Sequence, residues 1–210
     1  GELGGNLMDW HGRAGLLILG LLVFRVIWGF VGTPYARFLS FFPTPSRLRG
    51  YFAGSWRGYG HTPLGALSVI ALLLLLAALV GTGLFANDDI AFYGPLSDLV
   101  SKHTSDRLAG WHARLFNVLA ALVILHIAAV VFYAWVKKRD LVTAMLTGKK
   151  KIPAEAAAEV QAAPAFKVMA LRFMAALLFS GLAAWGVGGG IAGHHSAPSA
   201  QTPAAAKPDW

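Results

Sequence analysis

The segment from Leu64 to Ala86 reads LGALSVIALLLLLAALVGTGLFA and contains no charged side chain. About 20 apolar residues are enough to cross the hydrocarbon core of a bilayer as a helix. Three further stretches are similarly long and apolar, at about 10–32, 110–136 and 168–189. Backbone polar groups find no partner in lipid outside helices or closed barrels. The sequence therefore predicts an all-α fold, a transmembrane helical bundle of four spans.

The composition of the 210-residue chain agrees with a membrane protein. Hydrophobic residues make up 56% and charged residues 13%, with a mean hydropathy of +0.57. A soluble domain carries about a quarter charged residues. Cysteine is absent, which excludes disulfides, thiolate zinc sites, iron–sulfur clusters and covalently attached c-type haem. The charges behind the net charge of +8 lie mainly between the apolar stretches, where basic residues determine the orientation of the helices in the membrane.

The charges of the connecting segments predict the orientation. Residues 33–63 contain four arginines and no acid, and six basic residues follow the third span between 137 and 151. The segment between the second and third spans is acidic, with Asp88, Asp89, Asp98 and Asp106. Because short basic loops stay in the cytoplasm, we expect a multi-pass membrane protein whose two basic segments lie inside and whose N-terminus and acidic segment lie outside.

Residues 33–63 also contain many aromatic side chains, a mixture that suits the lipid headgroup region. Nucleic-acid binding is the other interpretation of such a mixture, and four membrane spans argue against it. We expect residues 1–151 to form the transmembrane core and 152–190 a linker with an additional helix. Residues 191–210 are rich in Ala, Pro and Ser and are predicted to be a flexible tail.

Three of the seven histidines, His11, His112 and His126, lie within or at the mouths of the spans. An ionisable side chain at membrane depth is costly and indicates function, although a core histidine bonded to a neighbouring helix is the alternative. His11 and His112 are expected at matching depth near the outer surface, where two imidazoles can bind one iron. Gly15, one turn after His11, leaves a gap for a flat macrocycle. Bis-imidazole haem b is the best fit.

His126 lies fourteen residues after His112 and therefore points the same way, about 21 Å along the helix. It is expected to bind a second haem, but none of the remaining spans supplies it with a partner histidine. Arg25 lies fourteen residues after His11 at roughly the depth of His126, where a haem propionate could pair with it. The alternative is an arginine that extends to the inner headgroups.

Several motifs resemble the bacterial cytochrome b561 family, which includes the haem b subunits of membrane nickel–iron hydrogenases. The similarity covers about residues 8–151. The matching segments are Met8–His11 with Gly15, Phe24–Gly32, Tyr35–Phe38, His61–Gly65 (with Thr62 in place of the family's Asn), Gly83–Phe85, Asp88–Ile90, Gly94–Leu96, His112, His126, Leu141–Met145 and Thr147–Lys149.

The resemblance implies a four-helix core in which His11 pairs with His112, and His126 with a histidine of the family's first helix. Since the chain begins where the family's second core helix begins, that first helix and its histidine are expected to be missing here. The outer haem is then complete within the chain, and the inner one needs an external or missing ligand.

The expected function is transmembrane electron transfer by a b-type cytochrome, between a periplasmic partner and a haem or quinone in the membrane. The resemblance implies a c-type cytochrome or a hydrogenase-like subunit as that partner. It also implies a multi-pass protein of the bacterial inner membrane, in which the N-terminus of this chain is periplasmic. The protein would be an electron-transfer subunit, not an enzyme by itself. A structural membrane anchor that has lost redox function is the main alternative. A small transporter or channel is a third, which neither a broken helix pair nor an internal repeat supports.

Overall fold

The computed structural model describes residues 2–58, 60–89, 92–138, 142–147 and 164–190. Within these residues there are four helices long and apolar enough to cross a membrane. They are α1 (Glu2–Val31), α4 (Pro63–Leu84), α5 (Lys102–Trp135) and α7 (Phe166–Trp185), the last continued by a helical turn at Gly186–Gly190. No strand forms in this part of the chain. The predicted all-α transmembrane bundle is confirmed.

Two of the helices begin earlier than hydropathy predicts. The first was expected from about residue 10 and begins at Glu2, and the third was expected from about 110 and begins at Lys102. At the start of α5 the side chain of Ser101 accepts a hydrogen bond from the Thr104 amide at 3.3 Å. Such a cap determines where a helix begins, whereas hydropathy detects only the part that is apolar enough for lipid.

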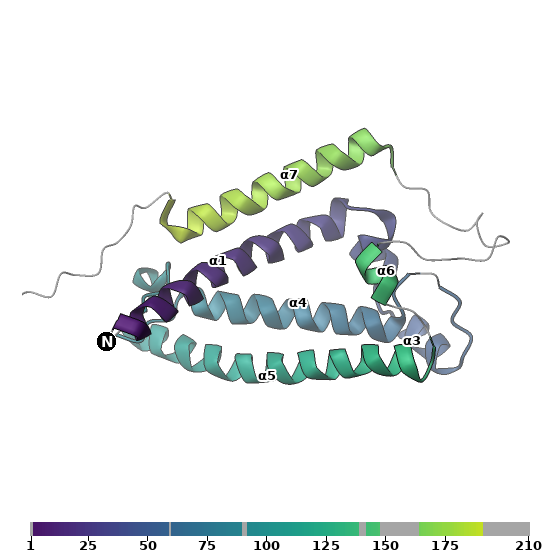
Figure 1. Cartoon of the computed structure of the whole chain (residues 1–210), viewed down its shortest axis with the longest axis horizontal. Coiled ribbons are helices and arrows are strands. Elements are labelled where there is room, and N and C mark those ends of the chain that lie inside the picture. The colour runs from purple at the N-terminus through teal and green to yellow at the C-terminus, as the bar shows by residue number, and fades with distance from the viewer. Residues whose placement is uncertain (1, 59, 90–91, 139–141, 148–163, 191–210) are drawn as a thin grey trace, which may run out of the picture.

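The helices form two pairs that spread apart toward one end (Figure 1). Helices α4 and α5 lie antiparallel side by side, and α7 packs antiparallel along α1. Small residues allow the second pair to approach closely, with Ala176 and Ser180 of α7 buried and a Cβ on Gly20 only 3.5 Å from the Ala184 methyl. We call the end where α1 and α5 begin the His11 end.

The opposite end, here the Arg47 end, is formed by the connection between α1 and α4. The sequence predicts a surface loop here, and the structure contains the short helices η1 (Pro34–Ala36), α2 (Phe38–Phe41) and α3 (Pro45–Phe52). The ring of Phe38 lies directly on Gly29 of α1, where an added Cβ would come within 2.0 Å of it. The connection therefore folds back onto the end of α1.

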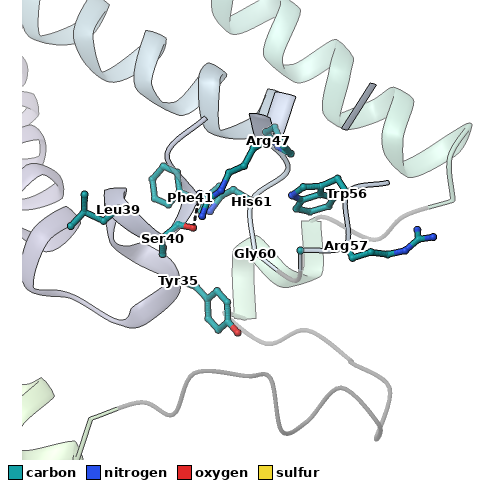
Figure 2. A pocket seen from close by; sticks show the side chains of 11 residues that line it. Tyr35, Leu39, Ser40, Phe41, Arg47, Trp56, Arg57, Gly60 and His61 are labelled. Atoms are coloured by element: carbon teal, nitrogen blue, oxygen red, sulfur yellow. Dashed lines mark hydrogen bonds between the residues drawn. The ribbon is translucent and has the colours of Figure 1, made fainter. Parts of the chain in front are cut away.

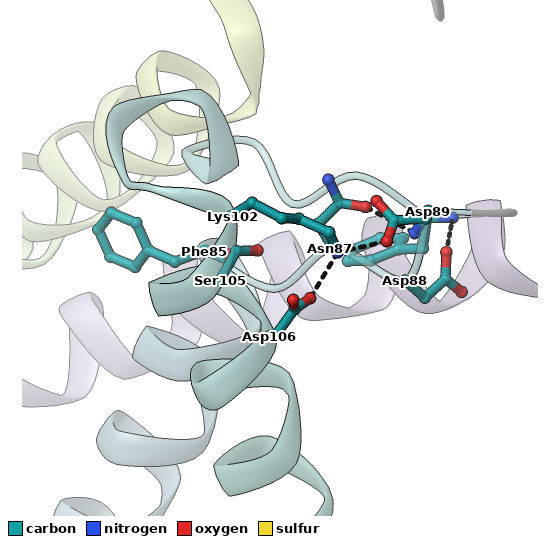
Figure 3. A network of polar contacts seen from close by, with 8 residues as sticks. Phe85, Asn87, Asp88, Asp89, Lys102, Ser105 and Asp106 are labelled. Carbon is teal, nitrogen blue, oxygen red and sulfur yellow. Dashed lines mark hydrogen bonds and ion pairs between the residues drawn. The ribbon is translucent and has the colours of Figure 1, made fainter.

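A polar network joins α4 to α5 at the His11 end (Figure 3). The hydroxyl of Ser105 donates to the Phe85 carbonyl at 2.7 Å, and Ser105 is buried. Lys102 forms ion pairs with Asp89 of the connection and with Asp106 of its own helix. These contacts hold the first turn of α5 against the end of α4, so the side chains of the next turns meet α4 in a fixed position.

The described residues leave two predictions untested. Helix α6 (Val142–Thr147) follows α5, and the linker expected from residue 152 lies mostly outside the described residues, as does the whole predicted tail 191–210. The proposed division of the chain into 1–151, 152–190 and 191–210 therefore stays a prediction.

Candidate functional site

The structure brings His11 and His112 together at the His11 end. Their ring centroids lie 5.8 Å apart, and the ring planes are nearly perpendicular, at 86°. His11 comes from the first half of α1 and His112 from the first half of α5. The ring of His112 is partly buried and that of His11 is exposed. The expected matching depth of the two side chains is thus what the structure shows.

Helix α4 holds His112 in place from its other side. The Nδ1 atom of His112 lies 2.9 Å from the Leu79 carbonyl oxygen. Since a carbonyl oxygen can only accept, Nδ1 is the donor in this contact, and in the neutral form of the ring Nε2 then has the free lone pair. Histidines that bind metals usually donate their other ring N–H to such an acceptor. Gly83 makes this position possible, because a Cβ there would lie 2.8 Å from Cε1 of His112.

Open space adjoins His11 on α1. A Cβ on Gly15 would meet no atom within 4 Å, so the expected gap one turn after His11 is present. The ring of Phe92, from the connection before α5, lies edge-on to His11 with centroids 6.1 Å apart. It also covers Gly12, where an added Cβ would come within 3.2 Å of the Phe92 ring. The His11 ring is therefore bounded on one side by an aromatic ring and is open toward Gly15.

The pair has the donor set that a haem iron would require, because two imidazoles from neighbouring helices lie with their ring centroids 5.8 Å apart. Within the described residues no group of three or more His, Asp or Glu gathers as a metal cluster would need. The two imidazoles and the open space at Gly15 would fit a flat iron macrocycle.

His126 lies further along α5 and has a different neighbour. Its Nδ1 is 2.9 Å from the hydroxyl oxygen of Ser68 on α4. Because a hydroxyl can donate or accept, this contact leaves the tautomer of His126 open. The ring is partly buried, and no aromatic contact with another histidine is found among the described residues. The structure therefore does not bring His126 together with a second imidazole.

Arg25 points toward the connection that follows α1. Its Nη1 donates to the Ala36 carbonyl at 3.4 Å, and its guanidinium lies over the Phe38 ring, 4.9 Å from the centroid. These contacts bind the end of α1 to η1 and α2. Arg25 thus joins the end of α1 to the connection that follows it. The pairing of Arg25 with a haem propionate stays a prediction.

In a comparison with protein families, the family described as prokaryotic cytochrome b561 matches residues 1–148 of the chain. The chain belongs to this family. Cytochromes b561 are membrane proteins that bind b-type haem and act in electron transfer. The chain is thus a multi-pass membrane protein of a haem-binding family. Comparisons with curated proteins and with solved structures give no match.

Four positions around the histidines of this cytochrome were not predicted as part of the site. They are Ser68, Leu79, Gly83 and Phe92. Ser68 carries a hydroxyl within the charge-free segment Leu64–Ala86, and a polar side chain in such a segment is a signal that the sequence does contain. The Leu79 carbonyl carries no sequence signal because every residue has one. Gly83 and Phe92 belong to the site because they lie close to His112 and His11. This proximity depends on how the connection between α4 and α5 folds.

The Arg47 end of the cytochrome contains a cavity of about 520 Å³ (Figure 2). Its polar lining includes Ser40, Arg47 and His61, and its apolar lining includes Leu39, Phe41 and Trp56; Tyr35, Arg57, Gly58, Gly60 and Pro63 complete it. His61 stacks at a tilt on Phe41, with centroids 4.4 Å apart. Desolvation, and to a smaller extent the positive charge of Arg25, hold the pKa of His61 below its ordinary value.

Proposed function

We propose that this cytochrome transfers electrons between a periplasmic redox partner and a haem or quinone in the membrane. The observation that carries the proposal is the His11–His112 pair, with rings 5.8 Å apart and the Leu79 carbonyl on Nδ1 of His112. Two neutral imidazoles would hold the iron of haem b, and the haem would supply a one-electron redox centre when bound.

In this proposal the two histidines and the residues around them have separate roles. His11 and His112 would hold the haem iron, and the Leu79 carbonyl would fix the tautomer and the orientation of His112. Gly83 leaves room for the His112 ring, and Gly15 leaves room for the macrocycle. Burial and hydrogen bonding to the ligands then set the redox potential.

A second haem is proposed at His126, with Ser68 as the hydrogen-bond partner of its ring. A second ligand for this haem would have to come from a residue other than those that the described helices place beside His126. Arg25 is proposed as a charge partner for a propionate near that level, because a guanidinium at this depth needs an anion. We call the position of His11 and His112 the first level and the position of His126 the second level. The two levels are about 21 Å apart along α5, so electrons would pass from one side of the membrane toward the other.

The periplasmic partner is proposed to be a c-type cytochrome or a hydrogenase-like subunit, which meets the His11 end. This assignment follows the positive-inside orientation, in which the arginine-containing connection at the Arg47 end faces the cytoplasm. The protein then works as an electron-transfer subunit of a larger oxidoreductase complex. It breaks no substrate bond by itself.

The test is visible spectroscopy of the full chain purified after haem-replete expression. We expect a b-type signal in the reduced-minus-oxidised spectrum, and its strong loss in His11→Ala and in His112→Ala. His103→Ala is the matched control, because His103 is exposed and lies in the first turn of α5. An unchanged haem content in both ligand variants would contradict the ligand assignment. A colourless wild-type protein would favour the structural anchor instead.

A further inference from the structure

The connection between α1 and α4 carries positive charge without compensation. Between residues 32 and 62 there are four arginines, Arg37, Arg47, Arg49 and Arg57, and no Asp or Glu. Both ion pairs found among the described residues involve Lys102, which lies at the opposite end of the bundle. Concentrated positive charge of this kind attracts an anion, and anionic lipid headgroups are the anions present at a membrane surface.

The cavity at this end presents Arg47 as a donor. The Nη1 atom of Arg47 donates to the carbonyls of Ser40 and Phe42 at 3.1 and 3.0 Å, which fixes the guanidinium in the cavity wall (Figure 2). A guanidinium has five N–H donors, so Nε and Nη2 stay available for another acceptor. The ring of His61 lines the same cavity. Arg57 extends away from it in Figure 2 and contributes charge at the rim.

The position of the cavity corresponds to the depth of lipid headgroups. Pro63, one of its lining residues, is the first residue of the membrane-spanning helix α4. Three apolar side chains of the same connection are exposed, Leu39 at 84%, Phe52 at 72% and Phe42 at 51%. Exposed apolar side chains beside arginines are typical of a segment that lies in the membrane interface. Acyl chains can cover them while a headgroup occupies the cavity.

We propose that this cavity binds the phosphate of an anionic phospholipid, with Arg47 as its main donor. A bidentate guanidinium–phosphate contact uses the donors that the backbone carbonyls leave free. The acyl chains would lie along the exposed side of Leu39 and its apolar neighbours. A quinone headgroup offers neutral carbonyls and would leave the charge of the connection without a counter-ion. The proposal is independent of haem binding at the other end.

The experiment measures lipid retention by native mass spectrometry of the full chain. The wild type, Arg47→Gln and Arg49→Gln are reconstituted in nanodiscs of phosphatidylcholine with or without phosphatidylglycerol, then released in detergent. Arg49 is the matched control, since it lies on the same short helix α3 and does not line the cavity. Arg47→Lys keeps the charge and serves as the second variant. A third arm adds inorganic phosphate at millimolar concentration as a competitor.

We expect phosphatidylglycerol to be retained by the wild type and by Arg49→Gln, and about fivefold less by Arg47→Gln, as for the loss of one basic residue at a membrane surface. Arg47→Lys should retain more than Arg47→Gln, and phosphate should not displace the lipid. Equal loss in both Gln variants, equal retention of phosphatidylcholine, or release by inorganic phosphate would each overturn the proposal. Circular dichroism of each variant checks that the helices are intact, so a folded Arg47→Gln protein with wild-type retention also refutes it.

Discussion

His112 and His126 lie on the same helix and contact the same neighbouring helix, yet their surroundings differ. His112 faces a second imidazole and a backbone carbonyl, whereas His126 meets one hydroxyl. The difference comes from α1, which lies close to α5 at the His11 end and moves away from it along the bundle (Figure 1). Helix α4 therefore supplies a partner at both levels, and α1 supplies one at the first level alone.

The largest expected effect comes from removing one histidine at each level. His112→Ala should abolish the haem that the pair binds, because no other described side chain stands ready to replace the lost ligand. His126→Ala should leave that haem in place and remove only the second haem proposed at His126. Haem stoichiometry and a redox titration of the two purified variants measure this. Identical spectra from both variants would show that the two levels are not separate sites.

The next effect concerns the space that the His112 ring occupies. Gly83→Ala should displace the ring, because the new Cβ would lie 2.8 Å from Cε1 and 2.9 Å from Nδ1. Overpacking of this kind costs about 1–3 kcal/mol, so haem content and thermal stability should both fall. Gly81→Ala is the matched control two residues earlier on α4, where a Cβ meets nothing within 4 Å. Equal haem content in the two variants would argue against close packing at Gly83.

A smaller effect is expected at the second level. Ser68→Ala removes the hydroxyl beside His126, and loss of such a partner weakens metal binding about tenfold or more. The spectrum of the His11–His112 level should stay unchanged. Ser180→Ala is a suitable comparison, since the Ser180 hydroxyl bonds only to a carbonyl of its own helix α7. A haem dissociation assay distinguishes the two, and equal dissociation rates would remove Ser68 from the site.

The smallest effect concerns ionisation at the Arg47 end. The pKa of His61 is held down by desolvation and by Arg25, so the folded chain binds this proton less readily than the unfolded chain. The contribution of His61 to the free energy of unfolding is therefore fully present above pH ~6.5 and declines as the pH falls below that value. Arg25→Gln should raise the pKa of His61 toward its ordinary value, and Arg49→Gln should not. Histidine NMR titrations follow both, and an unmoved pKa in Arg25→Gln would exclude the coupling.

The four membrane-spanning helices were predictable because hydropathy is a property of each residue and does not depend on how the chain folds. The four spans follow from their apolar composition, and only their starts were misplaced, where Ser101 caps α5 outside the apolar stretch. The short helices between α1 and α4 were not predicted, since they form by packing back onto α1. The facing of His11 and His112 followed from helical periodicity and topology. The Leu79 carbonyl and the Gly83 gap did not, because they depend on the register of α4 against α5.

His112 and His126 of α5 both have their hydrogen-bond partners on α4, and the polar contacts of Ser105 and Lys102 join the start of α5 to the end of α4 and the connection that follows it. The packing of α4 against α5 therefore keeps His112 and His126 at a constant spacing. His11 lies on α1, which packs along α7 and moves away from α5 along the bundle (Figure 1). A displacement of α1 relative to α5 would therefore change the distance between His11 and His112 and leave the contact between His126 and Ser68 unchanged.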